Sequence, residues 1–348
     1  MITTKTAPSP IGEITLVTIT NASGASVVLS TLGAGIVEVN VPDREGRLAD
    51  VVLGYANPAD YIADGPCAGK VPGRYANRIA GGHLEIEGKT YELPVNNGPN
   101  HLHGGPEGFQ NKIWTLESAE GNKAVMKYVA ADGEAGYPGQ LTATAEYRWT
   151  DANELELTLR AKTDAATVVN LTNHAYWNLD GHNSGSALDH KLTLMASTYL
   201  PTDDTLIPEG VKVPVAGSPM DFTKAKKLGS DIKLEFPALV YGKGYDNCWC
   251  IDDYKPGVVR TVAVLTDDKS GRVLTVDSDQ PGLQVYTGNW LAGSPANKAG
   301  RSYDDYDGVA IECQDFPDAP NKPGFPSTLL HAGEEYVRHI NFKFSTEK

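Results

Sequence analysis

The stretch 141–163, LTATAEYRWTDANELELTLRAKT, has the pattern of two β-strands joined by a polar turn at 151–153. In its second half the apolar residues Leu155, Leu157 and Leu159 alternate with polar ones. A period of two places the apolar side chains on one face of a strand and the polar side chains on the other. This alternation is typical of an antiparallel sheet that covers a core with one face and meets solvent with the other. The stretch therefore predicts a β-hairpin at the surface of a hydrophobic core.

Strand patterns of the same kind recur along the rest of the chain. They lie at 13–20, 25–42, 49–53, 84–93, 113–131, 191–201, 258–267, 272–279, 282–290, 308–316 and 335–344. Helical periodicity with capping residues does not extend beyond two turns, and the best short helix candidates are 57–61 and 221–228. Because the strand signals continue without a break across residue 180, we expect one all-β domain over 1–348, built as a large antiparallel β-sandwich.

The composition of the 348 residues limits the classes of function. No window of about 18 consecutive apolar residues exists, so a membrane-spanning helix is not expected. The formal net charge of -14 disfavours nucleic acid and anionic membranes as partners, because both bind clustered Lys and Arg. The first residues lack the basic start and apolar run of a secretory signal. We therefore expect a cytoplasmic protein with a small-molecule partner, unless a signal has been removed before this N-terminus.

Two patterns raise the question of a metal site. Cys248 and Cys250 would share one face of a strand, but neither a CxxC motif nor a second cysteine pair accompanies them. His101 and His103 have the same spacing, and a third ligand from elsewhere in the chain would be needed. Neither spacing requires an ion. The sequence therefore predicts core thiols at the two cysteines and no metal or other cofactor.

The stretch 168–179, VVNLTNHAYWNL, begins like a buried strand and then fills with polar and aromatic residues. At a period of two, Asn170, Thr172, His174 and Tyr176 share one face. A polar face on a strand flanked by apolar residues faces solvent or lines a wet cavity. The histidine and the tyrosine together favour a cavity that binds a ligand.

Two further strand patterns carry a polar residue in the middle of an apolar run. Glu312 faces the opposite way from its neighbours Ile311 and Cys313, and Gln284 lies in a similar run at 282–290. Burial of an unpaired carboxylate is costly, and desolvation raises the pKa of a carboxyl group toward neutrality, which suits a general acid or base. A Glu paired with a cation on a solvated sheet face is the alternative. If these strands and the histidine strand share one sheet, their polar groups would line one groove.

Other donors and acceptors lie in turn-like segments. In GRYANRI at 73–79, Arg74 and Arg78 lie four residues apart around Asn77, and their donors suit hydroxyl or carboxylate groups; a surface salt-bridge cluster is the alternative. His103 is followed by two glycines, which allow a close approach of the backbone to a ligand. Asp246 lies in Gly-Tyr-Asp, where a turn-forming aspartate is the alternative.

Aromatic residues accompany these polar groups along the sequence, namely Tyr176, Trp177, Tyr286 and Trp290. Aromatic faces beside amides and carboxylates suit a sugar, since a pyranose has apolar C–H faces and hydroxyl edges. Core packing is the alternative, and for Trp177 and Trp290 the two interpretations have equal weight.

Taken together, these motifs resemble those of the aldose 1-epimerases, or galactose mutarotases. They are GRYANRI (73–79), HLHGG (101–105), NLTNHAYWNL (170–179), GYD (244–246), GLQVYTGN (282–289) and ECQDFPDAPNKPGFPS (312–327), in the order found in the family. The resemblance implies a galactose mutarotase-like β-sandwich. It also implies an enzyme that interconverts the α and β anomers of a free aldohexose, such as galactose or glucose, without metal or cofactor. We expect a monomer or a homodimer.

The resemblance also implies roles for individual residues. Glu312 would be the general base that removes the proton of the C1 hydroxyl, and His174 the general acid that protonates the ring oxygen. The ring would open to the aldehyde, rotate about C1–C2 and close on the other face with the roles reversed. The positions that would bind sugar hydroxyls or support the acid and base are Asn77, Arg78, His103, Asp246, Gln284 and Tyr176.

The chain departs from the family pattern at two places. It has Asn-Cys at 247–248 where His-Asn is frequent, which bears on substrate preference, and Cys313 where Thr is common. Two other functions compete with the epimerase. A glycoside hydrolase would use Glu312 and Asp246 as two carboxylates at a set separation. A non-catalytic sugar-binding relative would be favoured if Glu312 or His174 were missing, and both are present.

Overall fold

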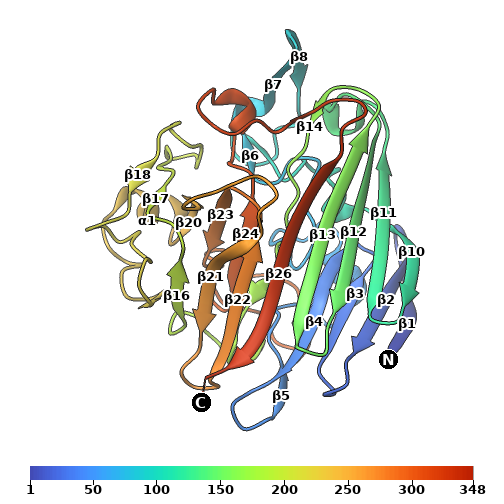
Figure 1. The fold of residues 1–348 in the computed structure, drawn as a ribbon, viewed down its shortest axis with the longest axis vertical. Helices are drawn as coiled ribbons and strands as arrows, with labels where there is room; N and C mark the ends of the chain where they lie inside the picture. The colour runs from blue at the N-terminus through green and yellow to red at the C-terminus, as the bar shows by residue number, and fades with distance from the viewer. Residues whose placement is uncertain (348) are drawn as a thin grey trace.

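The computed structural model describes residues 1–347 and confirms the predicted all-β sandwich (Figure 1). Within these residues, the pairs between named strands are all antiparallel, and most strands belong to three sheets. We call them the N-terminal sheet, the large sheet and the pocket sheet. The large sheet forms one layer of the sandwich. The other two sheets lie against its inner face and share its core.

The N-terminal sheet has the order β1 (Ile2–Ser9), β2 (Gly12–Thr20), β3 (Ser26–Ser30), β4 (Gly35–Pro42), β5 (Leu48–Asp50). The large sheet has the order β10 (Thr115–Glu120), β11 (Lys123–Ala130), β12 (Leu141–Trp149), β13 (Glu154–Thr163), β26 (Tyr336–Thr346), β22 (Arg272–Ser278), β21 (Arg260–Thr266), β16 (Lys191–Leu194), β19 (Lys226–Lys227). The pocket sheet has the order β15 (Tyr176–Trp177), β24 (Val309–Gln314), β23 (Gly282–Tyr286), β20 (Asp246–Cys250), β17 (Thr198–Tyr199), β18 (Val213–Pro214).

Short elements complete the described residues. Small ribbons pair β6 (Arg78–Ile79) with β9 (His101–Leu102), β7 (His83–Ile86) with β8 (Lys89–Glu92), and β14 (Thr167–Val168) with β25 (Leu329–Leu330). The helical segments are α1 (Pro237–Gly242) and the 3-10 turns η1 (Pro58–Tyr61), η2 (Ala80–Gly82), η3 (Phe109–Asn111), η4 (Glu134–Gly136) and η5 (Ala319–Asn321). No helix among residues 1–347 is long and apolar enough to cross a membrane.

The two layers are joined by one buried apolar cluster. It contains Leu157 of the large sheet, Val17 of the N-terminal sheet and Ile311 of the pocket sheet. Trp177 packs against Phe342 across the layers, with ring centroids 4.9 Å apart. This burial satisfies the alternating apolar pattern of the strands. It also turns the opposite face of the pocket sheet away from the core, and that face carries the polar residues of β20, β23 and β24.

Several predicted strands appear with the predicted turns, including the hairpins at 84–93, 113–131 and 141–163. The strand pattern at 168–179 does not form one continuous strand, because only Val168 and the pair Tyr176–Trp177 belong to named strands, β14 and β15. Between them the backbone bonds to other loops instead. His174 N–H, for example, donates to Lys70 O at 2.9 Å.

Other differences concern one strand that is divided between two sheets, and the helices. The predicted strand at 191–201 is divided into β16 and β17, which belong to different sheets. The helix candidate at 57–61 contains η1, whereas 221–228 is not helical. There the carboxylate of Asp221 accepts bonds from both the backbone and the hydroxyl of Thr223, which favours a turn over a helix. The sequence analysis missed α1 and the edge strand β1.

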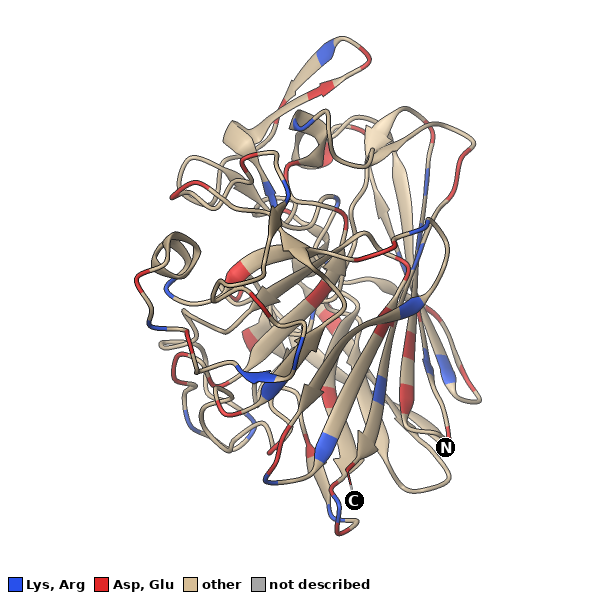
Figure 2. Cartoon of the chain, turned by 60° about the vertical axis from the view of Figure 1, so that its left-hand side comes forward, with Lys and Arg blue, Asp and Glu red and all other residues tan. Residues whose placement is uncertain are grey.

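Lys and Arg do not gather on one element. In Figure 2, basic and acidic segments are interspersed along the strands and loops. The basic and acidic residues behind the net charge of -14 are therefore distributed along many elements of the chain. Cys248 and Cys250 are buried beside Phe316, as predicted for core thiols.

Candidate active site

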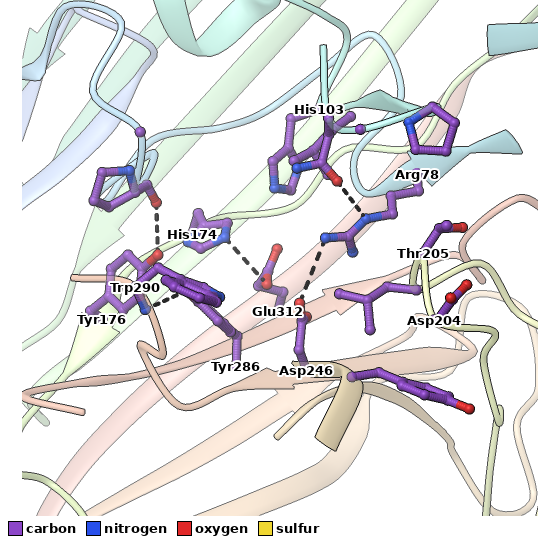
Figure 3. Close-up of a pocket in the computed structure, with 18 residues that line it drawn as sticks. Arg78, His103, His174, Tyr176, Asp204, Thr205, Asp246, Tyr286, Trp290 and Glu312 are labelled. Atoms are coloured by element: carbon purple, nitrogen blue, oxygen red, sulfur yellow. Dashed lines mark hydrogen bonds and ion pairs between the residues drawn. The ribbon is translucent and has the colours of Figure 1, made fainter. Parts of the chain in front are cut away.

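A cavity of about 610 Å³ opens above the polar face of the pocket sheet (Figure 3). Its inner wall contains His174, Tyr176 and Glu312, and His103 and Arg78 approach from the ribbon of β6 and β9. The cavity thus collects side chains from segments that lie far apart in the sequence. Its volume suits a small molecule with several polar groups.

The innermost side chains are a histidine and a glutamate. Glu312 lies in the middle of β24, and His174 comes two residues before β15, the strand that pairs with β24. Nε2 of His174 lies 3.4 Å from Oε1 of Glu312, and their side chains are only 6% and 2% exposed. The register of β24 explains the position of Glu312, because Val309, Ile311 and Cys313 face the core. The pair therefore meets at the closed end of the cavity.

Burial shifts the two pKa values in opposite directions. The pKa of Glu312 is raised well above its usual value, first by desolvation and then by the charge of Asp246, while Arg78 opposes the shift. Desolvation lowers the pKa of His174 to about 4, and the positive charge of Lys70 contributes to the same direction. Both shifts favour the neutral forms, so burial favours a protonated Glu312 beside an unprotonated His174 in the ligand-free site.

Arg78 and Asp246 lie beside this pair and form an ion pair with each other. Arg78 Nη2 lies 3.7 Å from Asp246 Oδ2, and Arg78 Nε donates to the Asn97 side chain at 3.0 Å. Gln284 does not line the cavity. From β23 it donates to Asp246 Oδ1 at 2.7 Å and so holds that carboxylate in place. Both charged groups face the cavity with hydrogen-bonding capacity left for a ligand.

The two predicted histidines of the 101–105 loop have different surroundings. His101 is buried away from the cavity, where its ring contacts Pro94 O at 2.7 Å and the Tyr137 hydroxyl at 2.6 Å. His103 lines the cavity. Its Nδ1 accepts a hydrogen bond of 3.1 Å from the backbone N–H of Asn77. Asn77 therefore lies behind His103 and supports it.

This contact determines which proton His103 carries. Desolvation, followed by the charge of His174, lowers the pKa of His103 well below its usual value, so the ring is neutral. Since Nδ1 accepts a bond, the proton is on Nε2, and His103 is a hydrogen-bond donor.

Possible metal ligands also come together here. Ligand atoms of His103, His174 and Glu312 lie within 4.8 Å of one another. A metal needs a free lone pair on each histidine. His103 has none to offer, because Nδ1 accepts from Asn77 N–H and Nε2 carries the proton. The donor set therefore does not fit a metal ion without a rearrangement of the loop around Asn77.

The predicted aromatic residues divide between core and cavity. Trp177 is fully buried in the core, whereas Trp290 is 67% exposed and lines the mouth of the cavity. Tyr176 donates to Pro66 O at 2.8 Å, and the Tyr286 hydroxyl accepts from Trp290 N at 3.1 Å. Figure 3 shows the rings of Tyr286 and Trp290 on one side of the Glu312 carboxylate. An apolar wall thus faces the polar wall of Arg78 and Asp246.

Several residues that line the cavity were not predicted from the sequence. They are Gly65, Pro66, Asn97, Gly98, Pro99, Leu102, Asp204, Thr205, Leu206 and Tyr241. The run at 95–100 is rich in Asn, Gly and Pro, which predicts an irregular loop but not a cavity wall. Residues 204–206 show no periodic pattern in the sequence, so their place in the cavity wall could not be predicted. Its backbone is fixed by the side chain of Asp203, which accepts bonds from Thr205 and Ile207.

Comparison with known proteins gives concordant results. The family described as aldose 1-epimerase matches residues 15–343. The chain is 42% identical to galactose mutarotase of Rattus norvegicus over 92% of this chain and 91% of the relative. It is 36% identical to aldose 1-epimerase of Escherichia coli K12 over 95% of both chains.

Solved structures agree with these matches. An aldose epimerase homologue from C. elegans superimposes with a TM-score of 0.88 at 31% identity, over 96% of this chain and 99% of the other. A galactose 1-epimerase from Lactobacillus acidophilus gives 0.86 at 27% identity, over 100% and 99%.

Proposed function

We propose that Glu312 and His174 are the acid–base pair of this chain, which belongs to the aldose 1-epimerase family. The chain is a carbohydrate isomerase that interconverts the α and β anomers of free aldohexoses. The observation that carries the proposal is the buried contact of 3.4 Å between these two side chains at the closed end of the cavity. The reaction needs a group that accepts a proton from the C1 hydroxyl and a group that donates one to the ring oxygen. Both oxygens are bonded to C1, so a close pair of side chains can reach both.

In the proposed cycle, ionised Glu312 takes the proton of the C1 hydroxyl while protonated His174 gives its proton to the ring oxygen. The C1–ring oxygen bond breaks, and the open-chain aldehyde forms. Rotation about C1–C2 presents the other face of the carbonyl. On closure His174 takes the proton back from the hydroxyl, and Glu312 returns its proton to the carbonyl oxygen.

The number of protons on the pair stays constant through this cycle. Ring opening moves one proton from His174 to Glu312 by way of the sugar, and closure reverses the transfer. The state after opening, with neutral His174 and protonated Glu312, is the state that burial favours. The site therefore stabilises the open-chain stage without exchanging a proton with solvent.

The surrounding residues support this assignment in separate ways. We propose that Arg78, Asp246 and the Nε2–H of His103 bind sugar hydroxyls, and that Tyr176 closes the cavity beside His174. Asn77 and Gln284 hold His103 and Asp246 in position. Tyr286 and Trp290 provide apolar surface for the C–H face of the ring.

The competing hydrolase is less well supported. Asp246 would have to act as the second carboxylate, but it is held by Gln284 and paired with Arg78. A hydrolase needs a carboxylate free to attack or to activate water. The relatives named above are epimerases and mutarotases.

The proposal is tested by polarimetry. Freshly dissolved α-D-glucose and α-D-galactose are followed with and without protein, and the buffer rate is subtracted. We expect faster relaxation to the same final rotation, since an isomerase leaves the equilibrium unchanged. A relaxation rate equal to that of buffer would overturn the proposed function. Release of nitrophenol from a nitrophenyl glycoside would point to the hydrolase. A single domain, a monomeric or homodimeric state and a cytoplasmic location stay predictions.

A further inference from the structure

The backbone on both sides of His174 is held by one loop, residues 64–70. His174 N–H donates to Lys70 O at 2.9 Å, and His174 O accepts from Gly69 N–H at 3.0 Å. The Asn173 side chain donates to Gly69 O at 2.7 Å. Since 171–175 pairs with no strand, these bonds replace the sheet ladder that would otherwise fix the histidine. The position of His174 therefore depends on the conformation of the loop.

The loop is closed by a fully buried ion pair. Lys70 Nζ lies 2.5 Å from Asp64 Oδ1 and donates to Tyr61 O at 2.5 Å, and both charged side chains are at most 1% exposed. The second oxygen of Asp64 accepts from Ala68 N–H at 2.9 Å and from the Tyr55 hydroxyl at 3.0 Å. These contacts tie both ends of the loop together. Buried ion pairs contribute little net stability compared with apolar residues, so their presence calls for another role.

The same loop reaches the cavity. Gly65 and Pro66 line it, and Pro66 O accepts the hydroxyl proton of Tyr176 at 2.8 Å. Gly69 has no room for a side chain, because a Cβ there would lie 2.0 Å from Ile36 O. The loop is thus wedged between β4 and His174. Lys70 lies on its protein-facing side, without lining the cavity.

We propose that Lys70, held by Asp64, is a positioning residue that fixes His174 through the 64–70 loop and places a positive charge behind it. This inference rests on the proposed roles of His174 and Glu312. The charge acts on proton transfer because Lys70 is buried, and Coulomb interactions are stronger in the interior than at the surface. A positive charge near an acid–base pair favours loss of its protons. Lys70 thereby helps His174 to release its proton to the sugar.

Other titratable and charged groups surround His174. Glu312 of β24 lies 3.4 Å away, and the rings of His103, Tyr176 and Tyr286 lie next to the His174 ring. Arg78 and Asp246 line the same cavity, and Asp64, Cys67 and Lys70 belong to the 64–70 loop. Of the residues outside the cavity lining, Lys70 is the cation whose charge lowers the pKa of His174. Its removal is therefore expected to raise the pKa values of the pair.

The test is the pH profile of kcat for α-D-galactose, measured by polarimetry. Single removal of Lys70 would leave Asp64 buried and unpaired, so the informative variant is the double substitution Asp64→Asn with Lys70→Met. We expect kcat at the optimum to fall about 10-fold through lost positioning, and both limbs of the profile to move to higher pH by at least about half a unit. Lys70→Arg keeps the charge and is expected to keep the wild-type limbs.

A matched control is available in a second enclosed ion pair. Lys298 pairs with Asp50 and donates to Val37 O and Val52 O, away from the cavity. The double substitution Asp50→Asn with Lys298→Met is expected to leave the pH limbs in place. Asp64→Asn alone is the fallback if the first double variant does not fold. It removes the negative partner and keeps Lys70, so its limbs are expected to move to lower pH.

The outcomes separate the inference from the function on which it rests. Wild-type protein without mutarotase activity would overturn the proposed function itself. An active wild type with unchanged limbs in both Asp64 variants would overturn the role of Lys70 alone. Equal shifts in the Lys298 control would also overturn it, because the effect would then be general to buried lysines.

Discussion

Nε2 of His174, in the segment before β15, lies 3.4 Å from Oε1 of Glu312 in β24, and the two side chains are only 6% and 2% exposed. Two buried ionisable groups this close share protons and titrate as a pair. Because each is desolvated, the neutral form of each is favoured. In the proposed cycle a proton moves from His174 to Glu312 through the hydroxyl and ring oxygens of the sugar. This relationship determines the expected behaviour of variants at either residue and of the enzyme as pH changes.

Glu312→Gln keeps the shape of the side chain and removes its ability to accept a proton. We expect kcat to fall by at least about 100-fold. The same change removes a carboxyl group whose pKa is raised by burial, and such a group loses folded-state stability as pH rises from its unfolded value toward its folded value. The variant should therefore unfold at a higher temperature than wild type at pH 8. Calorimetry and polarimetry on the same sample check both results, and near-normal activity of the Glu312→Gln variant would remove Glu312 from the mechanism.

His174→Asn is expected to cost a similar factor in kcat, at least about 100-fold. Since the pair acts as a unit, the double variant with Glu312→Gln should be no more than a few-fold slower than either single variant. Polarimetric rates for the four proteins form the cycle. Losses that multiply in the double variant would show that the two residues act in independent steps.

The pH profile of kcat should show a plateau with two limbs. Activity needs one proton on the pair. On the acid side a second proton binds His174, whose pKa is lowered to about 4, so activity falls as pH decreases through this region. On the basic side the pair loses its proton as pH rises through the raised pKa of Glu312. Polarimetry in a series of buffers, each with its own blank, tests this, and an acid limb near the ordinary histidine value would contradict it.

Asp246→Asn should move only one limb of that profile strongly. The negative charge of Asp246 raises the pKa of Glu312, so its removal is expected to move the basic limb to lower pH. The amide can still accept the bond from Gln284, so the fold should persist. KM should rise as well, because a proposed hydroxyl acceptor is lost. A basic limb that moves to higher pH would reverse the sign of this argument.

The fold was predictable wherever alternating apolar residues meet a single core. Leu155, Leu157 and Leu159 face the buried cluster as their spacing indicates, and Ile311 and Cys313 do the same around Glu312. The pairing of strands that lie far apart in the sequence could not be predicted. The sequence at 191–201 has no glycine and no internal proline to divide it, and nothing local indicates that β16 and β17 belong to different sheets.

The site was predictable to a lesser degree, for a physical reason. His174 and Glu312 stood out because polar groups inside apolar runs are costly. Asn77 and Gln284 were predicted to bind sugar hydroxyls or to support the acid and base, and residue type alone does not distinguish these two roles. In the structure the backbone N–H of Asn77 contacts His103, and the side chain of Gln284 contacts Asp246. The burial of Lys70 could not be predicted from the sequence, since it depends on an ion pair with Asp64, six residues earlier in a loop.

Asn170 links the segments that carry His174, Glu312 and Arg78. Its side chain accepts from Asp315 N–H at 2.9 Å and donates to Ala76 O at 3.1 Å and to Asp315 O at 3.3 Å, and the residue is fully buried. Asp315 lies three residues after Glu312, and Ala76 two residues before Arg78.

Asn170→Asp keeps the size of the side chain but removes the donor, and it places a carboxylate where two carbonyl oxygens face it. We expect a loss of about 2–4 kcal/mol in the free energy of unfolding by urea, because buried groups lose their partners. In the folded fraction kcat should fall more than KM rises, since the acid and base segments lose their common link. Asn21→Asp removes a similar but part-buried amide contact far from the cavity and should leave kcat unchanged. Equal effects of the two substitutions on kcat would show that Asn170 has only a general role in stability.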